Sequence, residues 1–547
     1  MKLLLVALMV CVLFVFTACA GAGQGTDQGA GTQAPAANQP ATGAAAAATD
    51  EPESPFAAAG TITYWVPLHP NAAQIISTWN DNEVFQEMER RTGVHVEFIH
   101  PPIGQETEQF NLMIASRDFP DIIARDYPGG HDMAIQQQIY RPLNEFVDIM
   151  PNFMRLVNKH PEIRSHVRTD SGYYFGWVQF NLPEDHEGGY AICPWAGPAL
   201  RGDFLDALDL PIPETIDDWY HMLIAFRDEL NVEIPFILPR NARPSGSSFV
   251  GTFGVANDFF QVDNIVKWGP MEPGFRDFLA TMNHWFNEGL LDPDFASTGT
   301  YVNFYAEVLT TGRAGSIAAS FQDIIPMYNS LFAEGEGRMI AVPYPVINRG
   351  DYIHIGSFTP IVENMNGRRS FLTTGVSDDR VEAIVRWRDN WYTDESTMLF
   401  NFGVEGRSFN MVNGEPVFTE LLADHPDGFT YAVAAWRYKL FAHSYRYIAP
   451  AMPPAQVEAA WSSIRVWATR NTRNHMMPPS AVPIAYVTEF SRLMTEINDF
   501  RDTMILRFIM GVEPMENFDD YVDELRSMGI ERAVELQQMG LDLFNAR

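Results

Sequence analysis

The stretch from Thr61 to Ala124 decides the fold. It opens with Thr61-Ile62-Thr63-Tyr64-Trp65-Val66, in which β-branched and aromatic side chains predict a strand. The elements predicted after it are a helix at 81–91 that Gly93 ends, a strand at 94–99, a helix at 106–116 and a short apolar strand at 121–124. This β-α-β-α-β order predicts a mostly parallel sheet with helices on its faces.

Residues just past the strand ends are the first candidates for a binding site. Ligands of open α/β sheets bind beyond the carboxyl ends of the strands. Trp65 stands at the end of the first predicted strand, and Asp126 and Tyr127 follow the third. We therefore expect these three side chains near any ligand.

A second unit is predicted to begin near Tyr190. Thr215 and Asp218 have the spacing of a capping box, and the apolar stripe behind them predicts a helix. Further helices are predicted at 274–288 and 378–392, and residues 454–547 are mainly helical in pattern. Four tryptophans within these stripes are predicted core residues: Trp219, Trp285, Trp387 and Trp391.

The amino terminus has the outline of a signal peptide. Lys2 precedes an apolar run at 3–16, which is shorter than the roughly 20 residues that a membrane-spanning helix needs. Phe16-Thr17-Ala18-Cys19 resembles the bacterial lipobox, in which the cysteine is acylated after cleavage before it. Residues 20–59 are almost wholly Ala, Gly, Gln, Thr and Pro, which predicts a flexible tether. Cys19 is thus the expected lipid anchor of an extracytoplasmic protein.

Composition excludes several classes of function. The net charge of -32, from 69 acidic and 37 basic residues, argues against a nucleic-acid partner. Of the three cysteines, Cys11 leaves with the signal peptide and Cys19 is the anchor, so no disulfide or thiolate zinc site is expected. Cys193, between apolar neighbours, is expected to be an inert buried thiol. No metalloprotease, nucleophile-elbow, Walker or dinucleotide motif occurs, and we expect no cofactor, no metal and no catalytic residue.

Several segments resemble one protein family in order and spacing. They are 114–123 (IASRDFPDII), 201–210 (RGDFLDALDL) followed by Pro213-Glu214-Thr215, 288–293 (EGLLDP), 312–315 (GRAG) and 403–406 (GVEG). Together they resemble the large lipoprotein solute-binding proteins of carbohydrate ABC importers, in particular the branch associated with aldouronate-type oligosaccharides. The resemblance spans nearly the whole chain from Thr61 onward.

This resemblance implies a type II periplasmic-binding-protein fold, with two α/β lobes and a hinged cleft between them. The crossovers are predicted near 172–177, 342–346 and 403–406. The corresponding division is a signal peptide at 1–18, a lipidated linker at 19–59, lobe 1 at 60–176 and 347–403, and lobe 2 at 177–346 and 404–547. Lobes of this kind close around a ligand by a hinge.

A cleft that binds a sugar needs flat aromatic surfaces and, beside them, the paired polar atoms of Asp, Asn, Glu or Arg side chains. The aromatic candidates, for each of which a core position is the alternative, are Trp65, Tyr127, Trp177, Trp195 and Tyr344. Arg201 is a candidate for pairing with the carboxylate of an acidic sugar, and a structural salt bridge with Asp203 or Asp206 is its alternative. Asp126 is predicted to accept hydrogen bonds from hydroxyl groups, with loop capping as its alternative.

The expected function is capture of an oligosaccharide, with or without uronic acids, for an ABC permease. We expect a monomer that meets the membrane through its lipid. The alternatives are a peptide-binding receptor on a related fold, which would use paired charged anchors, and a secreted glycoside-active enzyme, which would need a matched carboxylate pair.

Overall fold

The computed structural model describes residues 54–180, 194, 196–238, 249–295, 308–320, 337–357, 369–423, 431–440 and 454–547. All of the described residues belong to one compact unit, 53–547. The predicted signal peptide, the predicted anchor Cys19, most of the predicted tether, Cys193 and Trp195 lie outside the described residues. The folded part begins slightly before Gly60, because Ala59 is fully buried and the Ser54 hydroxyl donates to the carbonyl of Thr92 at 3.2 Å.

In the first sheet, whose strand order is β2-β1-β3-β11-β4, the strands of residues 62–123 have the predicted parallel arrangement. Its strands are β1 (Ile62–Trp65), β2 (Val96–Ile99), β3 (Ile122–Ile123), β4 (Trp177–Val178) and β11 (Arg369–Leu372). β1 runs parallel to both β2 and β3, whereas β11 is antiparallel to β3 and β4. The predicted helices occur as α1 (Glu83–Thr92) and α2 (Glu106–Ser116). A distant part of the chain thus supplies a strand to the sheet built by residues 62–123.

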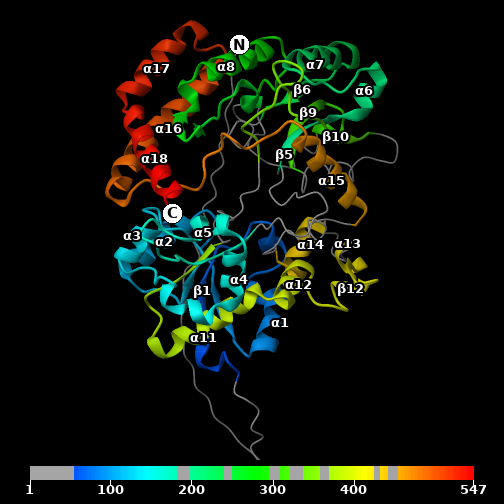
Figure 1. Cartoon of the computed structure of the whole chain (residues 1–547). Helices are drawn as coiled ribbons and strands as arrows, with labels where there is room; N and C mark the ends of the chain where they lie inside the picture. Colours follow the sequence, from blue (N-terminus) through cyan, green and yellow to red (C-terminus); the bar gives the residue numbers. More distant parts are fainter. Residues whose placement is uncertain are drawn as a thin grey trace, which may run out of the picture. The chain divides into compact units, whose positions relative to one another are not determined.

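Helices cover this first sheet. In Figure 1, β1 lies among α1, α4 (Pro151–Lys159), α11 (Asp378–Asp389) and α12 (Asp394–Phe402). One apolar cluster joins the sheet to these helices and contains Trp387 and Trp391, both predicted core residues. We call this sheet with its helices the first lobe.

The second sheet has the strand order β10-β5-β9-β6. Its strands are β5 (Ala196–Arg201), β6 (Ile234–Ile237), β9 (Ala314–Ser320) and β10 (Met339–Ala341). β9 is parallel to β6 and antiparallel to β5, which is also antiparallel to β10. We call this sheet with its helices the second lobe.

The two helices predicted for this part are α7 (Ile216–Leu230) and α8 (Pro273–Asn287). The predicted capping box is present, because Thr215 Oγ1 accepts from the backbone N–H of Asp218 while the Asp218 carboxylate accepts from that of Thr215. Trp219 and Trp285 are buried in the core of this lobe, as predicted. Three carboxyl-terminal helices belong here as well: α16 (Val487–Ile509), α17 (Phe518–Ser527) and α18 (Ile530–Asn545).

The remaining elements are shorter or lie at the edges of the lobes. The helices are α3 (His131–Gln136), α5 (Pro161–Val167), α6 (Gly202–Leu208), α13 (Glu420–Ala423), α14 (Tyr431–Tyr438) and α15 (Pro454–Ala468). The strands form two hairpins, β7 (Phe259–Val262) with β8 (Ile265–Trp268), and β12 (Phe409–Val412) with β13 (Glu415–Phe418). Among the described helices, none has the length and apolar character needed to cross a membrane.

The described stretches of the chain alternate between the two lobes. The changes of lobe fall between Phe180 and Ala196, between Ser357 and Arg369, and between Leu440 and Pro454. Each lies later in the chain than predicted. The last differs most, because residues 404–423 and 431–440 pack on the first lobe.

Two contacts show why residues 404–440 belong with the first lobe. Arg407 pairs with Glu83 of α1 at 3.0 Å, and the ring of Trp436 lies 5.6 Å from that of Trp79. Local sequence pattern marks the strands and helices of this segment but carries no information on which lobe they join.

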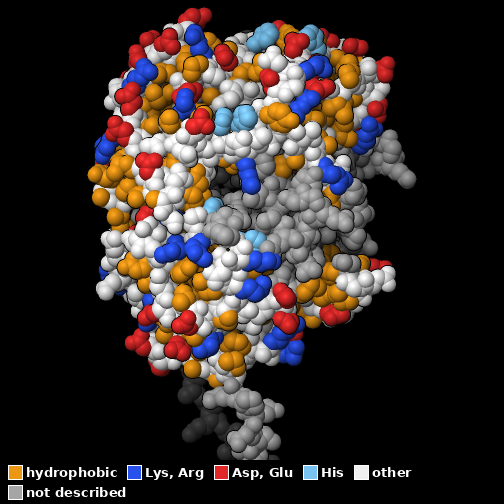
Figure 2. All heavy atoms as spheres, in the orientation of Figure 1, with side chains coloured by type: hydrophobic (Ala, Val, Ile, Leu, Met, Phe, Trp, Pro, Cys, Tyr) orange, Lys and Arg blue, Asp and Glu red, His pale blue; other side chains and the backbone are white. Residues whose placement is uncertain are grey.

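The acidic composition does not produce one acidic surface on the face seen in Figure 2. There, acidic side chains (red) lie on both lobes with basic ones (blue) between them. On this face the negative charge is therefore distributed and does not form a single binding surface.

Candidate ligand-binding site

Trp65 lies in the core of the first lobe. It is the last residue of β1, keeps 4% of its surface exposed, and places its ring 6.0 Å from that of Phe110 in α2. The strand-end position was correctly predicted. Its indole is nevertheless covered by α2, so this structure supports the core alternative.

Asp126 does lie at the carboxyl edge of the first sheet, and two side chains surround it. Its Oδ2 is 3.1 Å from Arg369 Nη2, and its Oδ1 is 3.5 Å from His131 Nε2. Arg369 opens β11, and because β11 runs antiparallel to β3, its first residue lies at the edge where β3 ends. We call Asp126, His131 and Arg369 the strand-edge cluster.

The charges of this cluster follow from burial. Burial raises the pKa of Asp126, while the charges of Arg369 and Arg125 oppose that rise. Burial, together with the positive charges of Arg369 and Arg547, lowers the pKa of His131 to about 3. The imidazole is therefore neutral at neutral pH, and its ring is stacked on Phe175 with centroids 4.0 Å apart. Arg369 balances the charge of Asp126.

One oxygen of Asp126 remains without a hydrogen bond. Oδ1 is buried and accepts none, because the 3.5 Å contact to His131 is too long for one. Such unpaired buried acceptors are rare in folded proteins. Asp126 thus keeps an unused acceptor beside its pair with Arg369.

Tyr127 lies next to this cluster and lines a pocket. Its hydroxyl donates to Gln137 Oε1 at 2.8 Å, and its ring is half-buried. The pocket has a volume of about 460 Å³ and is bounded by Asn111 of α2, by the 127–133 segment and by Thr488 and Ser491 of α16. It therefore has walls from both lobes, and it places Tyr127 at the boundary between them.

The carboxyl terminus also connects the lobes. Arg547 follows α18 of the second lobe, and its guanidinium donates to Asp170 Oδ1 of the first lobe at 2.7 and 2.9 Å. The same group donates to the backbone carbonyls of Ser165 and Arg168. These contacts place the end of α18 beside the strand-edge cluster, where the positive charge of Arg547 helps to lower the pKa of His131.

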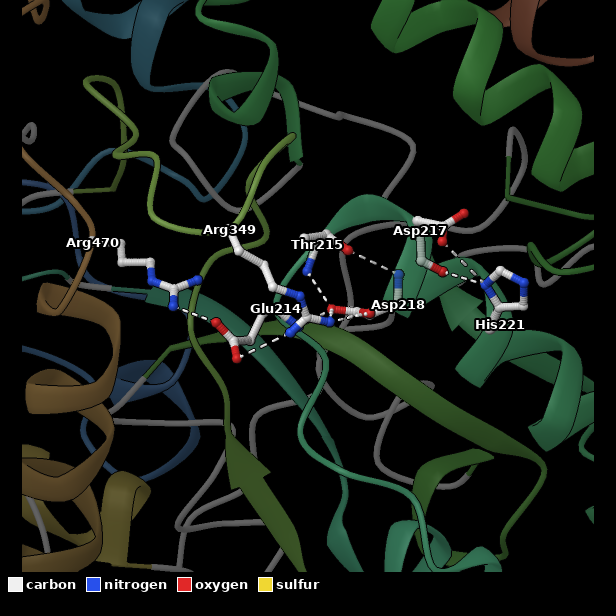
Figure 3. A network of polar contacts seen from close by, with 7 residues as sticks. All are labelled: Glu214, Thr215, Asp217, Asp218, His221, Arg349 and Arg470. Carbon is white, nitrogen blue, oxygen red and sulfur yellow. Dashed lines mark hydrogen bonds and ion pairs between the residues drawn. The ribbon is translucent and has the colours of Figure 1, made fainter.

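A polar network fixes the corresponding part of the second lobe (Figure 3). Glu214 pairs with Arg470 and lies 3.4 Å from Arg349, and Arg349 pairs with Asp218 at 2.7 Å. Through these pairs the start of α7, the loop at 347–351 and the segment after α15 are held together.

Arg201 is part of a structural ion pair, which is the alternative that the sequence left open. Its Nε and Nη2 donate to Asp203 at 2.8 and 2.5 Å, and Nη1 donates to the Leu309 carbonyl at 2.7 Å. Only 4% of the residue is exposed. The guanidinium is therefore used within the protein, and the structure does not support the prediction of a ligand carboxylate at Arg201.

Trp177 and Tyr344 are also enclosed. Trp177 is fully buried in β4, and Tyr344 is 2% exposed with its hydroxyl donating to the Ala196 carbonyl. In this structure neither presents a flat face at the surface. Of the seven predicted ligand-binding residues, only Asp126 and Tyr127 are brought together at the lobe boundary, and Trp195 lies outside the described residues.

Sequence reasoning missed His131, Arg369 and the network around Glu214. His131 and Arg369 lie in no motif, and Arg369 reaches Asp126 only because a strand from a late part of the chain joins the first sheet. Glu214 lies in a family-like segment, but the sequence does not show its pairs with Arg349 and Arg470. Within the described ranges, no group of three His, Cys, Asp or Glu side chains could hold a metal ion.

Comparison with known proteins places this geometry in context. No protein-family profile matches the chain. A fructooligosaccharide ABC transporter substrate-binding protein of Streptococcus pneumoniae is 28% identical over 232 residues, which is 39% of this chain and 42% of that protein. A lipoprotein of Bacillus subtilis is 21% identical over 370 residues, which is 61% of this chain and 65% of that protein. The matches thus span between about two fifths and two thirds of the length of these relatives.

Solved structures match over most of the chain. A crystal structure of an alginate-binding protein aligns with a TM-score of 0.68 and 20% identity, covering 88% of this chain and 98% of that one. The Streptococcus pneumoniae protein in complex with kestose aligns with a TM-score of 0.69 and 17% identity, covering 89% and 99%. These similarities confirm the predicted fold class and the predicted resemblance to solute-binding proteins of carbohydrate importers. These relatives and structural neighbours are described as binding proteins or a lipoprotein, not as enzymes.

Proposed function

We propose that this chain is an extracytoplasmic solute-binding protein that captures an oligosaccharide between its two lobes for an ABC importer. The observation that carries the proposal is the strand-edge cluster at the lobe boundary, within a fold shared with proteins that bind fructooligosaccharides and alginate. Sugar sites combine carboxylate acceptors with aromatic faces, and Asp126 beside Tyr127 offers one of each.

The pocket beside Tyr127 supports a hydroxyl-rich ligand. The side chains that line it are polar or apolar without charge, and they include Asn111, Thr488 and Ser491. A ligand there would contact both lobes at once. Because only a ligand that prefers the closed arrangement can shift the lobes towards it, contacts from both sides are what a capture mechanism requires.

Lipid attachment at Cys19 and delivery to a permease complete the proposal. The lipobox-like Phe16-Thr17-Ala18-Cys19 and the B. subtilis lipoprotein relative support the anchor. Two acyl chains hold a protein stably at a membrane, and the tether lets the folded part stand clear of it. Expression in a Gram-positive host with labelled palmitate should label the wild-type chain, and a Cys19→Ser variant should lose the label.

A ligand screen tests the central claim. The protein without residues 1–19 is mixed with kestose and longer fructooligosaccharides, with alginate oligosaccharides, and with oligopeptides as the comparison class. A ligand at 100 times its Kd adds about 2.7 kcal/mol of stability, which a thermal-shift assay detects easily. We expect stabilisation by an oligosaccharide. Stabilisation by peptides alone would refute the sugar assignment, and chromatographic detection of cleaved sugar would refute a pure binding role.

A further inference from the structure

The segment after α15 contains an unusual set of buried polar atoms. The atoms without a hydrogen-bond partner are Arg470 Nη1, both polar atoms of the Asn471 side chain, and His475 Nδ1. Buried polar groups in folded proteins are paired with few exceptions. Several unpaired atoms within six consecutive residues therefore need a physical explanation.

A loosely held backbone does not explain them. The backbone N–H of Ile353 donates to the Arg470 carbonyl at 2.9 Å, and that of Thr472 donates to the Ile353 carbonyl at 2.8 Å. His475 donates its backbone N–H to His354 at 3.2 Å. Residues 470–475 are thus fixed alongside 353–357, which is the last described stretch before the chain passes to the first lobe.

Asn471 is the most completely enclosed of the unpaired side chains. It is 8% exposed, and neither its carbonyl oxygen nor its amide nitrogen has a partner. Gly356 lies directly against it, since a Cβ atom added there would be 1.9 Å from Asn471 Nδ2. Any side chain at position 356 would therefore displace the carboxamide from its place beside the passage between the lobes.

The surroundings of the carboxamide are close to electrically neutral. The charge of Arg470 is balanced by Glu214, as Figure 3 shows. Burial and the neighbouring His354 lower the pKa of His475, so its ring is neutral at neutral pH. A neutral environment with unused donors and acceptors suits hydroxyl groups better than a carboxylate.

We propose that Asn471 is a specificity-determining residue that binds hydroxyl groups of the captured oligosaccharide from the second lobe. This inference rests on the proposed function and deepens it. A carboxamide presents a donor and an acceptor side by side, which matches two adjacent hydroxyls of a sugar ring. The unpaired carboxamide costs stability in the ligand-free protein, and the hydrogen bonds formed on binding recover that cost.

Replacing Asn471 by leucine of similar size tests the proposal through two effects of opposite sign. The ligand-free Asn471→Leu protein should melt at the wild-type temperature or above it, because an unpaired buried amide is removed. Its affinity, measured by calorimetric titration with kestose or with the panel sugar that stabilises the wild type most, should fall at least about tenfold, or about 1.4 kcal/mol. A lower melting temperature would instead mean that the amide already has a partner, such as a buried water, and would overturn the proposal.

Asn82→Leu is the matched control. Asn82 is fully buried in the first lobe, but its Oδ1 accepts from Val84 at 2.8 Å and its Nδ2 donates to the Trp436 carbonyl at 2.6 Å. This variant should melt at a lower temperature, and its remaining folded fraction should bind sugar normally. If the wild type binds no sugar in the panel, the proposed function fails and this inference with it. If the wild type binds and Asn471→Leu binds equally well, only this inference fails.

Discussion

Two arginine–aspartate pairs of this protein differ in how completely their hydrogen bonds are used. Arg201 donates two N–H groups to the Asp203 carboxylate and a third to the Leu309 carbonyl. Its guanidinium carbon lies 4.2 Å from the ring centre of Phe204. Asp126 Oδ2 lies 3.1 Å from Arg369 Nη2, and Asp126 Oδ1 accepts no hydrogen bond. Sequence alone had suggested both Arg201 and Asp126 as ligand-binding residues.

The difference separates a structural pair from a candidate site. A satisfied buried pair has nothing left to offer a ligand, and removing one partner leaves an isolated charge. An incompletely satisfied pair at a lobe boundary retains a hydrogen-bond acceptor for a ligand. The following substitutions test this contrast, in order of decreasing expected effect.

Arg201→Met should cause the largest loss of stability. The substitution leaves Asp203, whose side chain is 28% exposed, without the charge of Arg201, and it removes the hydrogen bond to the Leu309 carbonyl. The free energy of unfolding should therefore fall by about 3–5 kcal/mol. Urea denaturation measures this loss, and sugar affinity of the folded protein should be unchanged. Arg338→Met is the control, because its pair with Asp206 is exposed and is worth at most about 1 kcal/mol. Normal stability with lost binding in Arg201→Met would reverse our interpretation of this pair.

Asp126→Asn should instead weaken sugar binding strongly and lower stability less than Arg201→Met does. The carboxamide keeps the size of the side chain but loses its charge, so sugar affinity should fall about tenfold or more, as measured by calorimetry. Stability should fall by about 1–3 kcal/mol, because Arg369, 17% exposed, loses its charged partner. Asp206→Asn, at an exposed pair, should change neither quantity appreciably. Unchanged affinity in Asp126→Asn would exclude this cluster from the site.

His131→Phe should alter the pH dependence of stability. With a folded pKa of about 3 against an unfolded value of 6.5, His131 contributes stability that is complete above pH 6.5 and is lost as the pH falls towards 3. The loss should be at most about 1.4 kcal/mol per pH unit, and somewhat less here because 18% of the side chain is exposed. The free energy of unfolding should therefore change less between pH 7.5 and pH 5 for His131→Phe than for the wild type. The exposed His221→Phe should leave the wild-type slope intact.

Tyr127 variants should give the smallest effects on stability. Tyr127→Phe removes only the bond to Gln137 at an exposed position and should change the free energy of unfolding by less than about 0.5 kcal/mol. Tyr127→Ala removes the ring from the pocket and should weaken sugar binding several-fold while Tyr127→Phe leaves it unchanged. Equal affinity in all three proteins would show that the ligand does not contact this wall of the pocket.

Much of the architecture could be predicted from local pattern. The capping box at Thr215 and Asp218, the stop at Gly93 and the βαβ order of residues 62–123 are all found in the structure. The lobe that a late segment joins could not be predicted, because a surface helix such as α14 has the same apolar periodicity on either lobe.

The candidate site could be predicted only in part, for a different reason. Asp126 and Tyr127 were found because the carboxyl end of a strand is a position in sequence as well as in space. Trp65 and Trp177 were predicted by residue type, and their exposure depends on which helices cover them. His131 and Arg369 carry no sequence signal of a site, since their relation to Asp126 exists only in the assembled sheet.

The sequence by itself determined the fold class, the candidate anchor at Cys19 and the edge of the sheet where a ligand should be sought. It could do so because strand order, helix caps and apolar periodicity are set by neighbours along the chain. The tertiary structure decided which polar groups are satisfied. Arg201 finds its partners two residues away at Asp203 and 108 residues later at Leu309, whereas Asp126 and Asn471 each keep buried atoms unpaired. Hydrogen-bond satisfaction depends on distances between segments that are remote in sequence, and only the folded chain brings those segments together.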